Sequence, residues 1–528
     1  MNRDLSRRGV LAGAGGLGLG ALLAACGGSG GSTGTSASGG ASGPAKRGGS
    51  FRLAVAGSGA KDIIDGQNIV GKADQARIVA GWETLLTFDR DYKLTEDGLA
   101  EEVTAESPDT WVIRVRQGIE FHNAKTLGAD DVMYSLRRLV DPKLGLFGGA
   151  ALSSLDPNGL TKVDDRTVRL KLKQPDGTIR ESLAAYVAGI VPDGYTREDK
   201  EQVGTGPFKL QSFQPGKQSV HVRHPNYWRE GKPYLDQVTI IDIDDAAARV
   251  NALVAGQVEA AIDVPFAQVP IVSANKALVL FENEGGGWLP LCMRIDTPPF
   301  DDVQVRQAFR LIVDRDQMVK QAFAGHARVA NDLYGVFDAA YPSDLPQRKQ
   351  DIEQAKSLLK SAGKEGLTVE LVTSDQATGM NDMCKVFAQQ AKAAGVTVNL
   401  KIVDGATFYG DQYLKWAFSP DFWGTRGYLS QVAAGSLPTS PYNETHWPPK
   451  DTDFGDLYSK ARAEPDDTKR AAIIHDMYQL EYDQGGYIIP AFQNLIDAYS
   501  TKVRGFQKNR GTLNLDSFGR NYSEISFV

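Results

Sequence analysis

Residues 368–403 read TVELVTSDQATGMNDMCKVFAQQAKAAGVTVNLKIV, and this stretch decides the class of the fold. Residues 368–373 and 396–403 are short and rich in β-branched and aliphatic side chains, which predicts two strands. Between them, residues 381–394 carry apolar side chains at helical spacing: Met383, Val386, Phe387 and Ala391. Gly395 ends this helix. The stretch therefore predicts a βαβ unit, with a right-handed crossover if the two strands are parallel.

The same alternation of strands and helices continues outward from this unit. Further strands are predicted at residues 50–56, 111–116 and 167–172. Further helices are predicted at residues 130–140, 303–323 and 468–483. Alternating elements of both kinds indicate an α/β protein.

Composition and charge restrict the class of partner. The chain has 528 residues, 42% of them hydrophobic, and a formal net charge of −7. This length suggests roughly two or three domains. Residues 1–25 contain three arginines and one aspartate, so the rest of the chain is close to −9. A moderately acidic chain of this kind is not expected to bind nucleic acid or anionic lipid.

Residues 1–25 predict an export signal that is not part of the fold. Arginines precede an uncharged run that is too short and too rich in glycine for a comfortable membrane span. Residues 6–11 (SRRGVL) resemble a twin-arginine signal, and residues 23–26 (LAAC) resemble a bacterial lipobox. We therefore expect lipidation at Cys26, followed by a flexible tether over residues 26–46. An N-terminal transmembrane anchor is the alternative.

Several blocks along the chain carry a resemblance to a known family. They are residues 116–122 (RQGIEFH), 129–138 (ADDVMYSLRR), 203–208 (VGTGPF), 225–228 (PNYW), 232–236 (KPYLD), 248–260 (ARVNALVAGQVEA) and 298–308 (PPFDDVQVRQA). From residue 47 to residue 528 the chain resembles the family 5 extracellular solute-binding proteins. These are the dipeptide/oligopeptide-type receptors of ABC importers, and a lipoprotein signal in front of the blocks fits such a receptor.

The resemblance implies a type 2 periplasmic-binding-protein fold, in which two lobes are joined by a two-stranded hinge and the first lobe carries an extra inserted subdomain. The implied bounds are 47–86 for the start of lobe 1, 87–200 for the inserted subdomain, 201–287 for the continuation of lobe 1, 288–495 for lobe 2 and 496–528 for the C-terminal return to lobe 1. Gly285, Gly286 and Gly287 form a flexible run where the first crossing is expected, with an ordinary loop as the alternative. Residues 488–492 (IIPAF) suit the return crossing.

Residues 416–447 (WAFSPDFWGTRGYLSQVAAGSLPTSPYNETHW) are the candidate ligand-binding stretch. Large aromatic side chains with polar tips, held on loops, suit the capture of an organic ligand, whereas a core role for the rings is the alternative. The candidate residues here are Trp416, Asp421, Trp423, Gly424, Arg426, Tyr428, Asn443 and His446. Gly57 and Ser58, in the loop after the first strand, are expected to face them across the cleft.

The order of charged residues in this stretch departs from the family's peptide receptors. Those receptors commonly carry an Asp shortly after a Gly-Trp pair, and that Asp binds the α-amino group of the peptide. Here Asp421 precedes Trp423, and residues 424–426 (GTR) follow it. Arg426 is a candidate for pairing with a ligand carboxylate, and Asp421 is a candidate for an amine. Both alternatives stay open, and Asn443 suits either a peptide backbone or a sugar hydroxyl.

Catalytic and metal sites are not indicated. The six histidines form no H-E-x-x-H motif and the chain holds no C-x-x-C, so we expect no metal, no cofactor and no enzyme activity. Cys292 and Cys384 lie among apolar residues and are expected to be buried, with a disulfide between them as the alternative. Arg306 and Arg315 are expected to hold carboxylates of their own lobe. The candidates are Asp301, Asp302 and Asp314.

The expected function is that of an extracytoplasmic receptor of an ABC importer. The receptor, a monomer, would capture a small organic solute between its lobes and present it to the permease, with a short peptide favoured. It would be held at the outer face of the cytoplasmic membrane only through the lipid on Cys26. A receptor of the same family for an oligosaccharide or another solute is the first alternative, because the fold does not fix the ligand. A secreted hydrolase is the second, although neither an activated nucleophile nor a metal site is found for it.

Overall fold

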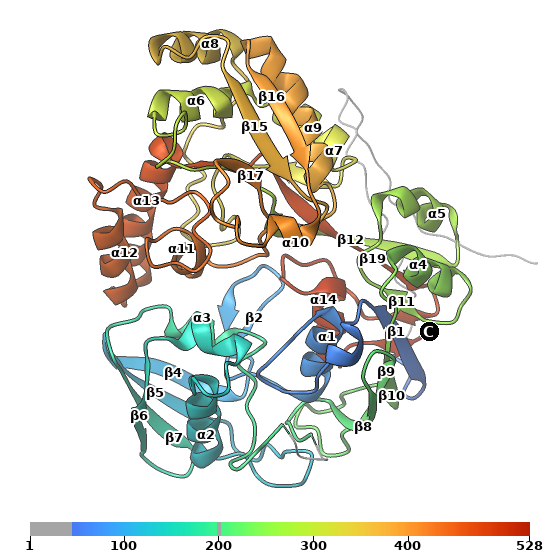
Figure 1. Cartoon of the computed structure of the whole chain (residues 1–528). Coiled ribbons are helices and arrows are strands. Elements are labelled where there is room, and N and C mark those ends of the chain that lie inside the picture. Colours follow the sequence, from blue (N-terminus) through green and yellow to red (C-terminus); the bar gives the residue numbers. More distant parts are fainter. Residues whose placement is uncertain (1–44, 198–201) are drawn as a thin grey trace, which may run out of the picture. The chain divides into compact units, whose positions relative to one another are not determined.

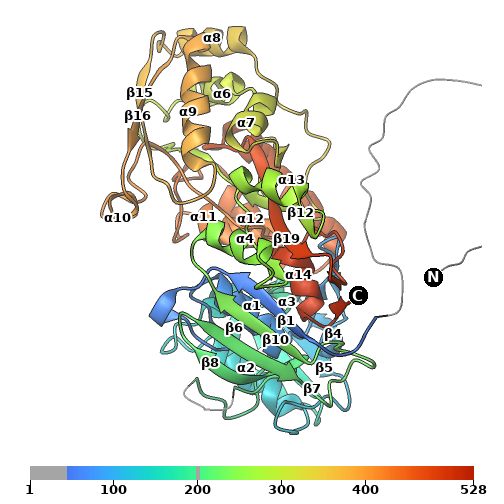
Figure 2. The same cartoon turned by 90° about the vertical axis from the view of Figure 1, so that its right-hand side faces the viewer.

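Residues 368–403 fold as predicted, into strand β15 (Thr368–Thr373), helix α9 (Met380–Ala391) and strand β16 (Thr397–Ile402). The two strands pair in parallel along their whole length, and α9 lies beside them (Figure 2). Of the four apolar residues predicted to be buried by α9, Met383, Phe387 and Ala391 lie in the core, while Val386 is half-buried. Gly395 has a φ of +76°, a left-handed conformation that suits glycine and that lets the chain turn from the helix into β16.

The structure is a computed structural model, and it describes residues 45–197 and 202–528. The predicted export signal, Cys26 and most of the predicted tether lie outside the described residues. Residue 200, the predicted end of the inserted subdomain, also lies outside them. Residues 43–528 belong to one compact unit.

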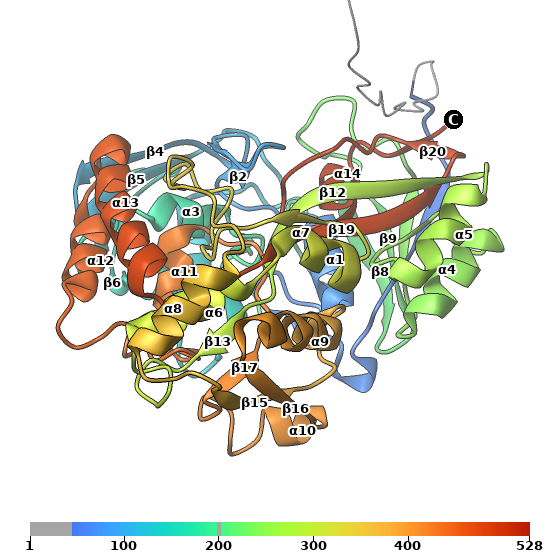
Figure 3. The same cartoon turned by 90° about the horizontal axis from the view of Figure 1, so that it is seen from above.

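An eight-stranded mixed sheet forms the body of what we call the first lobe. The order of its strands is β12 (Leu278–Trp288), β19 (Ala491–Ser500), β11 (Ala260–Ala261), β1 (Ser50–Val55), β10 (Gln237–Asp242), β9 (Gln218–Arg223) and β8 (Phe208–Gln214), with β14 (Ala327–Val329) also paired to β19. The helices of this part are α1 (Lys72–Gly81), α4 (Ala246–Val254), α5 (Val269–Ala274) and α14 (Asn514–Asn521). α5 packs against β12 and α4 against β19 (Figure 3). Strand β1 is parallel to both of its neighbours and buries Phe51, Leu53 and Val55.

Helix α14 is left-handed over residues 515–520, where φ lies between 49° and 68°. L-residues rarely adopt this conformation, so neighbouring groups must stabilise it. The carboxylate of Asp516 accepts hydrogen bonds from Arg90 at 3.0 Å and Arg520 at 2.9 Å, and Asp497 accepts one from the Leu515 N–H at 2.7 Å. These contacts hold the turn against the edge of the cavity described below.

A four-stranded antiparallel sheet also belongs to the first lobe and lies in the segment predicted as an insertion. Its order is β4 (Ala100–Ser107), β5 (Thr110–Val115), β7 (Thr167–Leu172) and β6 (Leu155–Lys162). Helix α2 (Ala129–Leu139) packs on it and buries Val132, Leu136 and Leu139. The start of α2 is acidic, and the Asp131 carboxylate accepts a hydrogen bond from the Gly128 N–H at 3.0 Å. The hairpin of β2 (Thr87–Phe88) and β3 (Leu94–Thr95) and helix α3 (Ile179–Ala184) complete this part.

The second lobe combines small sheets with helices (Figure 1). Its sheets are the β15–β16 pair and a three-stranded sheet in the order β17 (Phe418–Pro420), β13 (Leu291–Met293) and β18 (Tyr487–Ile488). Its helices, besides α9, are α6 (Val303–Ile312), α7 (Arg315–Ala322), α8 (Ile352–Ser361), α10 (Gly405–Phe408), α11 (Tyr428–Gly435), α12 (Phe454–Ala463) and α13 (Asp467–Gln484). Cys292 and Cys384 are buried here, and both are free thiols.

Two predictions for residues 303–323 are wrong. The stretch forms two helices, α6 and α7, because the Asp314 side chain accepts a hydrogen bond from the Gln317 N–H and so starts a new helix. Arg306 binds the backbone carbonyls of Phe300 at 2.7 Å and Gln484 at 2.8 Å, with no carboxylate among its hydrogen-bond partners in the described chain. Arg315 does hold a carboxylate of its own lobe, as predicted, but its partner at 2.6 Å is Asp332, which was not among the named examples.

Strands β12 and β19 connect the large sheet to the second lobe. They are antiparallel from Leu278 opposite Ser500 to Trp288 opposite Phe492, with a register shift between Asn283 and Gly287. The three glycines at 285–287 therefore lie inside a strand of this pair. The exact bounds of the domains stay predictions.

Close contact explains the glycine at position 285. A Cβ atom there would lie 1.9 Å from the carbonyl oxygen of Gln493 on β19. We expect Gly285→Ala to lower the free energy of unfolding by roughly 1–3 kcal/mol, since backbone on both sides must shift to admit the methyl group. Gly455→Ala is the control, because no heavy atom lies within 4 Å of a Cβ at that helical position. Urea unfolding of both variants tests this, and equal stability of the two would contradict the close packing of β12 on β19.

Candidate functional site

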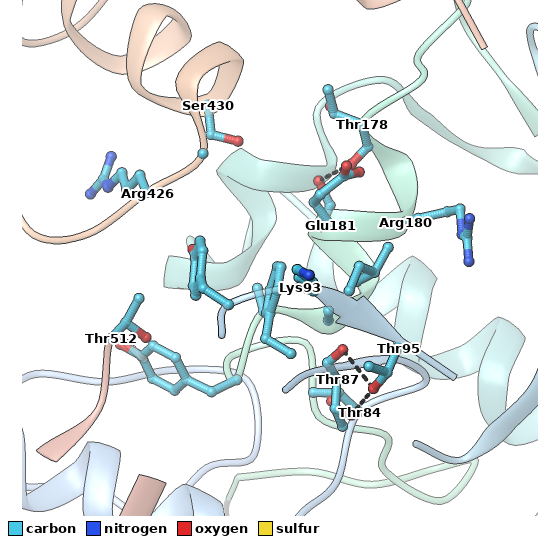
Figure 4. Close-up of a pocket in the computed structure, with 18 of the residues that line it drawn as sticks. Thr84, Thr87, Lys93, Thr95, Thr178, Arg180, Glu181, Arg426, Ser430 and Thr512 are labelled. Atoms are coloured by element: carbon cyan, nitrogen blue, oxygen red, sulfur yellow. Dashed lines mark hydrogen bonds between the residues drawn. The ribbon is translucent and has the colours of Figure 1, made fainter. Parts of the chain in front are cut away.

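A cavity of about 2320 Å³ is lined by residues of both lobes. The first lobe contributes the β2–β3 hairpin, α3 and residues 509–513, and the second lobe contributes residues 336–340 and the stretch from 424 into α11. Figure 4 shows Arg426 and Ser430 on the second-lobe ribbon, and Thr87, Thr95, Thr178 and Glu181 on ribbons of the first lobe. The volume exceeds the roughly 300–1,000 Å³ of a pocket for a drug-sized ligand, so a small organic solute fits with space for water.

Three of the ten predicted binding residues line this cavity: Gly424, Arg426 and Tyr428. The other seven are not among its lining residues. They are Trp416, Asp421, Trp423, Asn443, His446, Gly57 and Ser58.

Trp423 belongs to the core of the second lobe and does not line the cavity. Trp288 and Trp423 exchange two backbone hydrogen bonds of 3.0 Å, and their rings stack with centroids 6.0 Å apart. The indole is buried, so the core alternative describes this ring. Its half-buried neighbour in space is Arg426, whose guanidinium carbon lies 5.3 Å from the Trp423 ring centroid. The stacked tryptophans thus provide a rigid platform for a cation at the cavity.

Arg426 is a partly desolvated cation with no anionic partner among residues 45–197 and 202–528. Burial lowers the pKa of its guanidinium, and the phenols of Tyr186, Tyr442 and Tyr92 counteract part of that shift. Among the described residues, no hydrogen bond or ion pair to this guanidinium is formed beyond its contact with Trp423. Burying an unpaired charge costs free energy, so a site of this kind favours a ligand that supplies an anion.

Asp421 belongs to a buried acid cluster inside the second lobe. Its carboxylate accepts hydrogen bonds from Tyr409 at 3.0 Å and Tyr413 at 3.1 Å. Burial raises the pKa of Asp421, and burial together with the Asp421 charge raises the pKa of Glu444 well above its usual range. The proximity of the two carboxyls disfavours ionisation of both at once. Asp421 is thus engaged with Tyr409 and Tyr413 inside the second lobe.

The remaining predicted residues have structural contacts. Asn443 donates to the Leu437 carbonyl at 2.9 Å and accepts from the Trp447 N–H at 3.0 Å, which closes a turn. The ring of His446 lies 2.9 Å from an Asp296 carboxylate oxygen. The Trp416 indole donates to the Phe408 carbonyl at 3.1 Å. In the first lobe, the N–H groups of Gly57 and Ser58 donate to Asp244 and Asp62.

Comparison with known proteins identifies the family. Residues 95–443 match the model of the bacterial extracellular solute-binding proteins, family 5 middle region. The chain belongs to this family. The glutathione-binding protein GsiB of Pectobacterium atrosepticum is 26% identical over 464 residues, covering 82% of this chain and 87% of that protein. The dipeptide-binding protein of Escherichia coli is 27% identical over 450 residues, covering 78% of this chain and 83% of that protein.

Solved structures agree on the fold of this family 5 protein. The oligopeptide-binding protein AppA of Bacillus subtilis, solved with a nonapeptide, superposes with a TM-score of 0.71 at 20% identity, covering 92% of this chain and 100% of that chain. The fold is therefore of the type 2 periplasmic-binding-protein class, as predicted. The family and these relatives are solute-binding proteins, and the chain is an extracellular solute-binding protein. No helix in the described part of the chain is long and apolar enough to cross a membrane.

Several cavity residues of this family 5 protein were not predicted from the sequence. Tyr92 in the β2–β3 turn stacks on Phe88 with ring centroids 4.5 Å apart. Glu181 on α3 and Asp338 of the second lobe bring carboxyl groups to the wall. In the sequence Glu181 is one acidic residue in a short amphipathic segment, IRESLA, with no motif around it. Only the packing of α3 against the β2–β3 hairpin brings it to the cavity.

Proposed function

We propose that this protein captures a short peptide, or another small solute with a carboxylate, in the cavity between its lobes. The single observation that supports this most is the unpaired guanidinium of Arg426 on the cavity wall. A guanidinium forms two parallel hydrogen bonds with a carboxylate, and both strengthen where water is excluded. Relatives named for binding dipeptides and glutathione, both of which carry carboxylates, support the same choice.

A neutral oligosaccharide receptor is the second candidate within the family. The aromatic rings at the cavity, among them Tyr92 and Tyr442, suit sugar stacking as well as peptide side chains. A neutral sugar would leave the charge of Arg426 without an anion, so the carboxylated solute is the stronger proposal.

The transport role includes an anchor and a permease. We propose that the chain acts as a monomer at the outer face of the cytoplasmic membrane, held there by a lipid on Cys26. Residues 26–46 would serve as a flexible tether, and their Gly- and Ser-rich composition supports this. Closure of the lobes around the solute would then present a surface to the transmembrane subunits of the importer, as expected if ligand binds the closed form more tightly.

Thermal unfolding with a defined panel of solutes tests the proposal. A ligand present at a hundredfold excess over its Kd adds about 2.7 kcal/mol to the stability of the folded state. We expect dipeptides and tripeptides with free carboxylates to raise the Tm, and their C-terminal amides and neutral oligosaccharides to have little effect. A larger shift with sugars than with any peptide would favour the second candidate. No shift with any member of the panel would contradict solute capture in this cavity.

A further inference from the structure

Glu181 is a cavity carboxyl with one oxygen that has no hydrogen-bond partner among the described residues. It lies on α3 and lines the cavity (Figure 4). Its Oε2 atom is buried and accepts no hydrogen bond from any described residue. Its own backbone N–H is the only hydrogen-bond donor to its carboxyl in the described chain. Burying a carboxyl oxygen without a hydrogen-bond donor costs free energy. A ligand that donates a hydrogen bond to Glu181 Oε2 would remove this cost.

The charges around Glu181 are predominantly acidic. Burial, with smaller contributions from the carboxylates of Asp338 and Asp467, raises the pKa of the Glu181 carboxyl to about 7. Arg470 on α13 is the one guanidinium that opposes them. That guanidinium is already bound to the Glu464 carbonyl at 2.9 Å and to Asp467. The Arg470 guanidinium is therefore already engaged, and a further positive charge beside Glu181 would be stabilised.

A metal ion is a poor candidate for this charge. No group of three His, Cys, Asp or Glu side chains in the described chain is placed to hold a metal. Asp338 accepts hydrogen bonds from the N–H groups of Tyr428 at 2.8 Å and Ala340 at 2.9 Å, so its oxygens already have donors. An ammonium group needs only hydrogen-bond acceptors, and the free Oε2 of Glu181 provides one.

Tyr92 links this acidic region to Arg426. Burial raises the pKa of the Tyr92 phenol, Asp338 and Glu181 raise it further, and Arg426 opposes the shift. The Tyr92 phenol therefore interacts electrostatically with the Asp338 and Glu181 carboxyls and with the Arg426 guanidinium. The cavity thus carries the acidic side chain of Glu181 on its first-lobe wall and the basic side chain of Arg426 on its second-lobe wall.

We infer that the cavity takes a zwitterionic solute, with its ammonium group bound by Glu181 of the first lobe and its carboxylate bound by Arg426 of the second lobe. This rests on the proposed function, in which Arg426 binds the carboxylate. A ligand of this kind contacts both lobes through opposite charges. It would therefore stabilise the arrangement in which the two walls approach each other.

Binding from chemically modified peptide pools tests this inference. The ligand source is a tryptic digest of casein, used untreated, acetylated on its amines or methyl-esterified on its carboxylates. Native mass spectrometry measures which peptides bind to the wild-type chain, to Glu181→Gln and to Glu353→Gln. Glu353 is the control because it is an exposed residue of α8, paired only with Lys356.

We expect the wild type and Glu353→Gln to bind peptides from the untreated pool at least tenfold more tightly than from the acetylated pool. Glu181→Gln should lose this preference while its Tm stays close to that of the wild type. Equal binding of the acetylated and untreated pools by the wild type would overturn the inference and leave the proposed function intact. Binding from the esterified pool as tight as from the untreated pool would contradict the role of Arg426. No binding from any pool would contradict both.

The pH dependence of binding gives a second test. The ammonium ligand pairs only with the ionised form of Glu181, so affinity should fall as the pH drops through 7. The groups that face Glu181 from neighbouring elements are Asp338, Asp467, Arg470 and Tyr92, and all four are present in both the wild type and Glu181→Gln. We expect the affinity of the wild type for untreated peptides to fall several-fold between pH 7 and pH 5.5, and that of Glu181→Gln to stay constant. A parallel fall in both proteins would overturn the inference.

Discussion

Asp332→Asn is expected to lower the free energy of unfolding by about 3–5 kcal/mol, the typical cost of breaking a buried ion pair by removing one partner. The Asp332 carboxylate is fully buried and lies 2.6 Å from both Arg315 and Arg348. It also accepts a hydrogen bond from the Ile489 N–H at 3.0 Å, close to the start of β19. Asparagine keeps the shape and tolerates the φ of +61° at this position, so the variant removes mainly the charge.

The pH dependence of the Asp332 contribution has a definite sign. Burial alone would raise the pKa of Asp332, but Arg315, Arg348 and Arg310 together hold it below its usual range. A depressed pKa in the folded state stabilises the protein above the unfolded pKa of an aspartate, and this stabilisation is lost as the pH falls through the folded value. The difference in stability between the wild type and Asp332→Asn should therefore be full at pH 7 and shrink in acid.

Urea unfolding at pH 7 and at lower pH measures this difference. The matched control is Asp344→Asn, because Asp344 is exposed and pairs only with His475 at 3.0 Å, a contact of little stabilising value. If Asp332→Asn lowered the free energy of unfolding by less than about 1 kcal/mol, the loss would be no larger than that expected for an exposed ion pair. The interpretation of Asp332 as the anion that holds two buried guanidinium groups together would then be wrong.

Arg426→Ala is expected to cost about 2–5 kcal/mol of binding free energy for a carboxylated ligand, the usual effect of truncating one partner of a buried charge pair. This corresponds to at least about a 30-fold increase in Kd. The guanidinium rests on the Trp423 ring and has no anion in the described chain, so the ligand carboxylate would be its only strong partner. Arg426→Lys should restore little of this binding free energy, because an ammonium group cannot form the two parallel hydrogen bonds that a planar guanidinium makes with a carboxylate.

Isothermal titration with a peptide identified from the pool measures the effect. Arg294→Ala is the control, since Arg294 pairs with Asp296 at 2.9 Å and is not among the residues that line the cavity. If Arg426→Ala and Arg294→Ala both bound the peptide with the affinity of the wild type, the proposal that Arg426 binds the ligand carboxylate would be wrong.

Local pattern was sufficient to predict the βαβ unit, because α9 buries residues at helical spacing between two β-branched strands. It was insufficient at residues 303–323, where one capping aspartate divides a continuous apolar stripe into two helices. Arg315 illustrates a further limit. Its partner Asp332 is 17 positions away and comes close only through the tertiary fold, so no local spacing pointed to the pair.

The candidate site was predicted in part. The sequence predicted residues 416–447 as the ligand-binding stretch, and Gly424, Arg426 and Tyr428 of that stretch do line the cavity. The rings of Trp423 and Trp447 are buried in the core of the second lobe, since hydrophobic side chains on loops fill interiors as readily as they bind ligands. Glu181 and Tyr92 come from segments about 240 to 350 residues away in the chain, and only the packing of separate elements around one cavity brings them near Arg426.

The central claim is that the cavity binds a solute through its carboxylate. Native mass spectrometry tests it most directly, with the wild-type chain mixed with equimolar free peptides, their C-terminal amides and neutral oligosaccharides. The predicted result is a one-to-one complex with free peptides, with the amides and sugars absent from the bound fraction. Complexes with amides or sugars in equal amount, or no complex with any member of the mixture, would contradict the claim.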